Sequence, residues 1–382
     1  MEFKIFTAGK DDSSRRLDKI LRLLLPSAPL SEIYSITRKG LVKVNDKKAK
    51  AETKILEGDK IQIAAFIVEK YGENQGAKAP ENIENFPEKI PESASQKKIR
   101  QPDAGQGKFC QAETRQINAT QQRSGEQKSE TADKTKYKFP FKIIFKNQHI
   151  LILEKPYGIT VHGKNDSMDV HVKKYYGSLK ENSSLSFKPG PLHRLDERTS
   201  GLIAFSWSLK GAIWFSENIK NHSIQKEYLA IVQGKVRKKE SWKDYIVKEN
   251  NNEKKNFHTV KAVSFQSSEN EKISLTDITP LKTFKYKNQD LSLVSFNIHT
   301  GRTHQIRSAS ALHGFPLFGD SAYGAFPLEK DTAVKQELFL HAWRLTFPEN
   351  TISIPQSVTC PLPENFKIFL EKCNCEISDL GL

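Results

Sequence analysis

Three polar stretches interrupt otherwise apolar segments of the chain, and their side chains are the ones best suited to chemistry. They are PLHRLDERTSGL (191–202), QKEYLAIVQG (225–234) and HTGRTHQIR (299–307). Charged groups beside buried strands are costly unless they are paired or have a function. A carboxylate such as that of Asp196 can act as a nucleophile or as a base. The alternative for Asp196, which lies between two arginines, is a salt bridge at the edge of a sheet.

The sequence carries no pattern typical of a bound cofactor or metal. It has no glycine-rich phosphate loop of the Walker or dinucleotide type, so we expect no nucleotide cofactor. Four cysteines occur, and they form neither a disulfide framework nor a pair of C-x2-C half-sites for zinc: Cys110, Cys360, Cys373 and Cys375. We expect no metal and no small-molecule cofactor.

The composition favours a polyanionic partner. Among 382 residues, 60 Lys and Arg outnumber 45 Asp and Glu, which gives a net charge of +15. Contacts with phosphates release condensed counterions, so this surplus suits nucleic acid, and it would also suit an anionic membrane. The sequence has no apolar run of about 18 residues and no basic-then-apolar N-terminus. We therefore expect a soluble, cytoplasmic protein that does not bind a membrane.

The elements that must position the three polar stretches form a mixed pattern. Two short runs rich in β-formers open the region, in FKIIFKNQHILILEKPYGITVH, and further strands are predicted at Gly201–Ser206, Tyr228–Val232 and Leu291–Ile298. Helices are predicted from Ser208 to Asn221, and from an N-cap at Thr303 to about His313. Strands and helices without a regular βα repeat indicate an α+β domain.

The N-terminal segment predicts two helices on a small sheet. An apolar stripe with helical spacing ends before Pro26, and it consists of Leu17, Ile20, Leu21, Leu24 and Leu25. A second helix is predicted from an N-cap at Ser31 to a C′ residue at Gly40. After it, LVKVNDKKA and LEGDKIQI have the alternation and turn residues of short strands.

Cations gather on this segment. Residues 13–70 contain 13 Lys and Arg against 7 Asp and Glu. Most runs of charge are only a solvated face, but here the cations lie on two successive helices and the loop after them, which favours RNA binding. The candidate RNA contacts are Arg15, Arg16, Lys19, Arg38 and Lys39.

A polar segment separates this module from the α+β domain. Residues 71–138 have few large aliphatic side chains and many Gln, Glu, Lys, Ser and Asn, so they cannot bury enough apolar surface to offset the entropy lost on ordering. We predict a flexible linker or insertion there, with an RNA-binding module at 13–70 and a catalytic domain at 139–382.

Both predicted domains resemble known families. RRLDKIL, SEIYSITRKGLVKVNDKKAK and LEGDKI resemble the S4 RNA-binding domain. HRLDERTSGL, KEYLAIVQG, TGRTHQIR, HGFPLFGDSAYG and LFLHAWRLTFP resemble, in order, five blocks of the RluA-like pseudouridine synthases, nearest to the C-type enzymes of large-subunit ribosomal RNA. This resemblance implies a small S4 domain, a polar linker and a mixed-sheet catalytic domain, with no cofactor.

The resemblance also implies roles for single residues. Asp196 would be the essential carboxylate, as nucleophile or as base, and Tyr228 would stack beneath the uracil. Arg307 would form a bidentate pair with Asp196, and we prefer it to Arg302, which suits a phosphate contact better. Arg194 would either fill the stack left by a flipped base or hold a phosphate.

The function that follows is the isomerisation of uridine to pseudouridine in large-subunit ribosomal RNA, by a monomer. Two alternatives remain at this stage. One is the same chemistry on transfer RNA, since phosphate contacts carry no sequence information. The other is a non-catalytic RNA-binding protein of ribosome assembly.

Overall fold

The computed structural model describes residues 1–72, 137–179, 184–248, 260–266, 271–326 and 338–375. The predicted linker therefore lies almost wholly outside the described residues. None of the described helices is long and apolar enough to cross a bilayer.

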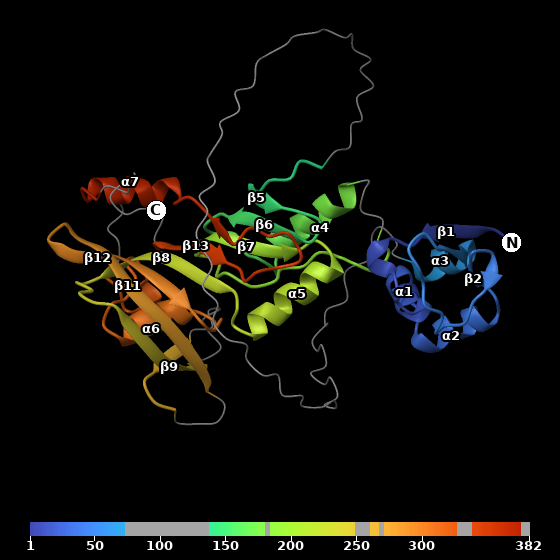
Figure 1. The fold of residues 1–382 in the computed structure, drawn as a ribbon, viewed down its shortest axis with the longest axis horizontal. Coiled ribbons are helices and arrows are strands. Elements are labelled where there is room, and N and C mark those ends of the chain that lie inside the picture. The colour runs from blue at the N-terminus through green and yellow to red at the C-terminus, as the bar shows by residue number, and fades with distance from the viewer. Residues whose placement is uncertain (73–136, 180–183, 249–259, 267–270, 327–337, 376–382) are drawn as a thin grey trace, which may run out of the picture. The chain divides into compact units, whose positions relative to one another are not determined.

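The N-terminal residues form a four-stranded antiparallel sheet with three helices (Figure 1). The strand order is β1-β4-β2-β3, with β1 Phe3–Thr7, β2 Val42–Val44, β3 Lys47–Lys48 and β4 Lys60–Ala64. The helices are α1 Leu17–Leu24, α2 Leu30–Arg38 and α3 Ala65–Tyr71. The prediction of two helices followed by short strands is confirmed, and β1 and α3 are additional.

The apolar stripe of α1 forms the centre of this small core. Leu17, Ile20 and Leu21 are fully buried and pack in one cluster with residues of α2 and the sheet. Gly40 has φ +74°, which fits the predicted C′ position after α2. The predicted N-cap of α2 is wrong, because the helix begins at Leu30 after Pro29 and has no side-chain cap.

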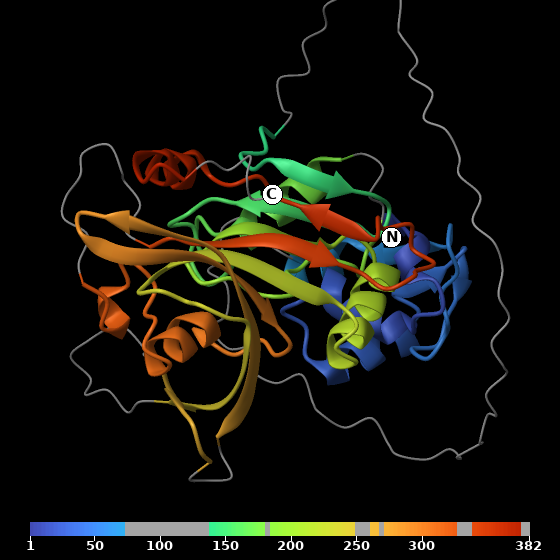
Figure 2. The same ribbon diagram turned by 60° about the vertical axis from the view of Figure 1, so that its left-hand side comes forward.

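The remaining strands form a ten-stranded mixed sheet with the order β10-β9-β11-β12-β8-β13-β7-β6-β5, and β14 pairs with β13 (Figure 2). Among the described strands, β7 and β13 are the parallel pair and the other pairs are antiparallel. The bounds are β5 Ile143–Lys146, β6 Ile150–Lys155, β7 Ser200–Ser206, β8 Gln225–Gln233, β9 Glu240–Lys248, β10 Val260–Val263, β11 Lys272–Tyr286, β12 Gln289–Ile298, β13 Leu340–Thr346 and β14 Ser357–Thr359.

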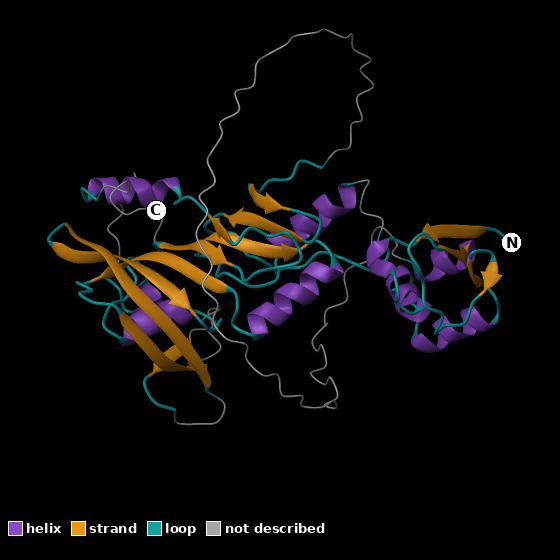
Figure 3. Ribbon diagram, in the orientation of Figure 1, coloured by secondary structure: helices purple, strands orange, loops and turns teal. Residues whose placement is uncertain are grey.

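Helices pack on both faces of this sheet (Figure 3). They are α4 Met168–Ser178, α5 Leu209–Lys220, α6 Gln305–Leu312 and α7 Glu364–Lys372. One apolar cluster joins buried residues of α4 and α6 to the sheet face that carries Tyr228, and other clusters join α5 and α7 to alternate strand residues. Together with the small N-terminal sheet, this arrangement confirms the predicted α+β class.

Two helix starts show where local signals succeed and fail. The helix predicted from Ser208 is α5, with Ser208 as its N-cap, and the Ser208 side chain accepts a hydrogen bond from the Gly211 amide. The predicted cap at Thr303 is wrong. His304 adopts the left-handed conformation with φ +50°, so α6 begins at Gln305.

Candidate active site

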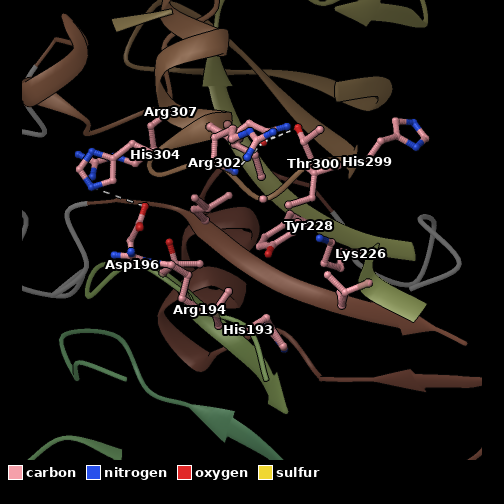
Figure 4. Close-up of a pocket in the computed structure, with 18 of the residues that line it drawn as sticks. His193, Arg194, Asp196, Lys226, Tyr228, His299, Thr300, Arg302, His304 and Arg307 are labelled. Atoms are coloured by element: carbon pink, nitrogen blue, oxygen red, sulfur yellow. Dashed lines mark hydrogen bonds and ion pairs between the residues drawn. The ribbon is translucent and has the colours of Figure 1, made fainter. Parts of the chain in front are cut away.

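The three polar stretches of the sequence meet at one cavity of about 370 Å³ (Figure 4). Its walls come from the loop before β7, the start of β8, the end of β12 and the start of α6. The five residues singled out in this domain all line it: Arg194, Asp196, Tyr228, Arg302 and Arg307. The structure therefore brings together side chains that are up to 113 positions apart in the chain.

A buried lysine donates hydrogen bonds to the backbone of the loop that carries Asp196. Lys155, at the end of β6, is 0% exposed and its ammonium donates to the backbone carbonyls of Pro156, Glu197 and Thr199, at 2.9, 3.0 and 2.7 Å. Burial lowers the pKa of Lys155 to about 7, while the charges of Asp196 and Glu197 act in the opposite direction. This lysine fixes the backbone on the C-terminal side of Asp196.

Just after this loop, β7 approaches β13 very closely. A Cβ atom on Gly201 would lie 2.2 Å from the carbonyl oxygen of Ala342, and Gly201 has φ +110°. Only glycine fits this position. The strand that anchors the Asp196 loop can therefore pair with β13 in parallel.

Arg307 lies beside the cavity, but its bidentate partner is a different carboxylate from the predicted one. Its Nε and Nη2 donate to the two oxygens of Asp320, at 2.6 and 2.8 Å. Asp320 is 0% exposed. Burial works against the charged guanidinium, but the pair with Asp320 outweighs it and raises the pKa of Arg307. The prediction of a bidentate pair with Asp196 is wrong, because the guanidinium fork is already occupied by a carboxylate inside the core.

The group that directly faces the Asp196 carboxylate is His304. Its Nε2 lies 3.8 Å from Oδ2 of Asp196, as the dashed line in Figure 4 marks. Its Nδ1 lies 2.7 Å from the hydroxyl of Tyr323, which accepts the amide of Val260 at 3.3 Å. That hydroxyl has one proton, which it can donate to Nδ1. This arrangement favours the tautomer with the proton on Nε2, facing Asp196.

The left-handed turn at His304 is fixed by Gln305. The side-chain oxygen of Gln305 accepts from the Thr300 hydroxyl (2.8 Å) and the Arg302 amide (3.0 Å). Its amide nitrogen donates to the Leu275 carbonyl and the Thr276 hydroxyl of β11, each at 3.0 Å. Gln305 is 3% exposed, so all its polar atoms are satisfied inside the protein. The loop from Thr300 to His304 is thereby attached to the sheet.

Tyr228 lies on β8 between the two ends of the cavity (Figure 4). Its side chain is 6% exposed and belongs to the apolar cluster beneath the cavity. Burial and the charge of Asp196 both raise the pKa of the Tyr228 phenol, so it stays protonated at neutral pH. The aromatic ring of a neutral tyrosine that is partly open to a cavity can stack against a flat base.

Two family models match this chain in the order in which its domains occur. The RNA pseudouridylate synthase model matches residues 149–312, which include Asp196, Tyr228 and Arg307, and the S4 domain model matches residues 15–61. Ribosomal large subunit pseudouridine synthase C of Vibrio vulnificus is 26% identical over 95% of this chain and 94% of its own length. The protein of the same name from Buchnera aphidicola is 27% identical, over 97% of each chain.

This chain is a pseudouridine synthase of the RluA family. Its N-terminal domain is an S4 domain, as the sequence resemblance predicted. A solved structure, human RNA pseudouridylate synthase domain containing 4, covers 62% of this synthase and 94% of its own chain, at 21% identity and a TM-score of 0.49.

In the S4 domain of the synthase, the five predicted RNA contacts lie on α1, on α2 or directly beside these helices. Arg38 lines a hollow of about 500 Å³ with Lys48 and Lys50. Arg16 is held by Asp18, with both contacts at 3.1 Å. Lys19 and Lys39 are exposed, and Arg15 is half-buried.

Sequence reasoning missed several residues of the synthase site. His304, Asp320 and Tyr323 all lie within the blocks that carried the family resemblance, but no role was assigned to them. Only the left-handed turn brings His304 to Asp196, and such a turn gives little signal in the sequence. Among the described residues, no three His, Cys, Asp or Glu side chains lie close enough together to hold a metal ion.

Proposed function

We propose that this synthase isomerises uridines in large-subunit ribosomal RNA, as a cytoplasmic monomer. The observation that carries the proposal is the full-length match to relatives named ribosomal large subunit pseudouridine synthase C. The net charge of +15 supports a polyanionic substrate. We propose domain limits of 13–70 for the S4 domain, 71–138 for the linker and 139–382 for the catalytic domain.

In the proposed mechanism, Asp196 is the catalytic carboxylate. The N1–C1′ bond of uridine breaks, the uracil turns, and a C5–C1′ bond forms, so that the proton at C5 is lost and N1 gains one. No atom is added and no electron is transferred. The carboxylate acts either as a nucleophile or as the base that removes a sugar proton, and both routes need it ionised at this place. The cation Arg307 lies close enough to interact with the charge of Asp196, although its two donors are bound to Asp320.

The other cavity residues fit the handling of a flipped base. We propose that Tyr228 stacks against the uracil and that Arg302 contacts a phosphate. The Nε of Arg302 donates to the carbonyl of Ile273 at 3.0 Å, which holds its guanidinium at the cavity. Arg194 is exposed at the opposite wall, where it can fill the vacated stack or hold the strand.

His304 gives a pH prediction. Burial lowers the pKa of His304 below its ordinary 6.5, while Asp196 and Asp320 raise it and Arg307 and Arg194 lower it further. The imidazole is therefore neutral at pH 7, and it gains a proton only below its ordinary pKa. Single-turnover rates from pH 5 to 8.5 should be level above pH 6.5 and fall below it. A His304→Gln variant, which retains a donor, should change the acid limb. A rate that keeps rising from pH 6.5 to 8 would contradict the assignment of the acid limb to His304.

The S4 domain gives a salt prediction. Replacing Lys19, Arg38 and Lys39 by Gln in the full chain should weaken RNA binding and flatten its dependence on log salt, by about one unit for each phosphate that is no longer neutralised. Saturating RNA should restore the rate, because the catalytic cavity is unchanged. Lys261 on β10 and Lys272 and Lys285 on β11 are exposed, and their replacement by Gln removes the same three charges as a control. An unchanged salt slope in the S4 variant would show that these cations do not bind RNA.

The substrate itself can be tested in cells. Pseudouridines are mapped in total RNA with and without the gene for this chain. We expect sites in large-subunit ribosomal RNA to disappear and to return with the wild-type protein but not with Asp196→Asn. If the missing sites lie only in transfer RNA, the proposed substrate is wrong. If no site disappears, the alternative of a non-catalytic role in ribosome assembly is favoured.

A further inference from the structure

Among the described residues, Lys155 and Lys226 are buried near the active site, and of these two Lys155 alone has protein partners. Lys155 donates to three carbonyl oxygens. Lys226, on β8, is 9% exposed and lines the active-site cavity. Within the part of the chain that the structure describes, its ammonium has no hydrogen bond and no ion pair. The two side chains have the same chemistry, but the fold satisfies only Lys155.

The side chain of Lys226 is largely buried, while its ammonium opens on the cavity without a protein partner among the described residues, which is unfavourable for the free protein. Burial alone lowers the pKa of Lys226 below its ordinary 10.5. Buried charges in proteins are normally paired or used for function. The position of Lys226 therefore indicates that an anionic group of a bound ligand pairs with its ammonium.

No carboxylate in the described part of the chain pairs with Lys226. Asp196 is the one acidic residue among those that line the cavity, and in Figure 4 it lies on the opposite side of Tyr228 from Lys226. Glu227 is the neighbour of Lys226, but it is 3.7 Å from Arg344, on the other face of the strand. His193 also lines the cavity, and burial lowers its pKa to about 3, so it stays neutral. The cavity therefore has its carboxylate at one end, and Lys226 lies at the other end.

The wall opposite Lys226 is backbone. A Cβ atom on Gly301 would lie 3.8 Å from the Lys226 ammonium nitrogen, so the glycine faces it directly. Gly301 is exposed, and the next residue is Arg302, whose guanidinium is held at the same cavity. A small residue beside two cations leaves room for an anion.

We propose that Lys226 and Arg302 bind one phosphodiester of the RNA strand next to the target uridine. This inference rests on the proposed function of the cavity as a uridine site. Lys226 and Tyr228 are two positions apart on β8 and line the same cavity, so they lie about 7 Å apart along the strand. A base that stacks on Tyr228 thus brings its own backbone towards Lys226. The phosphate supplies the charge that the free protein lacks, and the lysine binds it as a point charge.

The proposal makes stability and binding change in opposite directions. Replacing Lys226 by Met removes an uncompensated buried charge, so the Tm of the free protein should rise by about 2–4 °C. The same change should raise the Kd for RNA about tenfold and lower the salt slope by about one, with kcat changed less than the KM. A lysine with only a structural role would lower the Tm when removed. Lys285→Met is the control for removal of one exposed cation.

The ligand is tested by a cycle that changes both partners. The probe is a synthetic RNA carrying a mapped target uridine, with a neutral methylphosphonate at either flanking phosphate. Wild-type protein should lose about tenfold in affinity at one of the two positions, and Lys226→Met or Lys226→Gln should lose clearly less there, because only Arg302 still contacts the phosphate. The proposal is overturned if wild type tolerates both methylphosphonates, or if the variants lose as much as wild type does. Tritium release by wild type from the unmodified RNA reports separately on the proposed function.

Discussion

Asp196→Asn is expected to abolish pseudouridine formation and to leave RNA binding nearly unchanged. The amide keeps the size of the side chain, but it can neither attack carbon nor accept a proton. Loss of a group that acts only in the transition state lowers kcat with little effect on binding, and we expect a fall of at least ~10³-fold. Phosphate contacts from the cationic surfaces supply most of the binding free energy.

The adjacent carboxylate provides the control for this variant. Glu197 is 47% exposed at its side chain and pairs with Lys164 at 3.1 Å, outside the cavity lining. Glu197→Gln should therefore keep the wild-type rate. Single-turnover rates and filter binding on the same RNA separate chemistry from affinity. An Asp196→Asn protein that reacts at the wild-type rate would remove Asp196 from the mechanism.

Arg307→Met is expected to cost both stability and activity. Asp320 is 0% exposed, so removal of the guanidinium leaves an unpaired carboxylate in the core, at a cost of about 3–5 kcal/mol in the free energy of unfolding. The cation also lies over the ring of Tyr323, 4.8 Å from its centroid, and the variant lacks this cation–π interaction as well. Urea unfolding measures the stability, and Arg302→Met should have a much smaller effect.

A double variant separates the two roles of Arg307. In Arg307→Met with Asp320→Leu no charge remains buried, so most of the missing stability should return. Activity should stay low, because the cation near Asp196 is still absent. If the double variant recovers full activity, Arg307 is only a structural residue.

Local sequence patterns were sufficient for much of the fold. The apolar stripe of α1, the start of α5 at Ser208 and Gly40 after α2 depend on neighbouring residues, and each lies where it was predicted. Strands β9, β11 and β13 were not predicted. Their pairing is between distant segments, and β-propensity depends strongly on that context.

The sequence predicted which residues lie in the active site, but not which of their side chains contact one another. Family order was enough to place Asp196, Tyr228 and Arg307 at one cavity. It could not show that the guanidinium of Arg307 binds Asp320 and not Asp196. Both aspartates lie in the matching blocks, and the order of the blocks does not say which one Arg307 contacts. Nor could it show that His304 faces Asp196, because that depends on one left-handed residue.

The measurement that tests the central claim most directly is tritium release from large-subunit ribosomal RNA labelled at C5 of uridine. Bond formation at C5 expels the label, so release reports the isomerisation itself. We expect the wild-type protein to release tritium in a fixed ratio to the RNA, with no metal or cofactor added, and Asp196→Asn to release none. Absence of release from free large-subunit RNA and from precursor particles alike would contradict the proposed substrate.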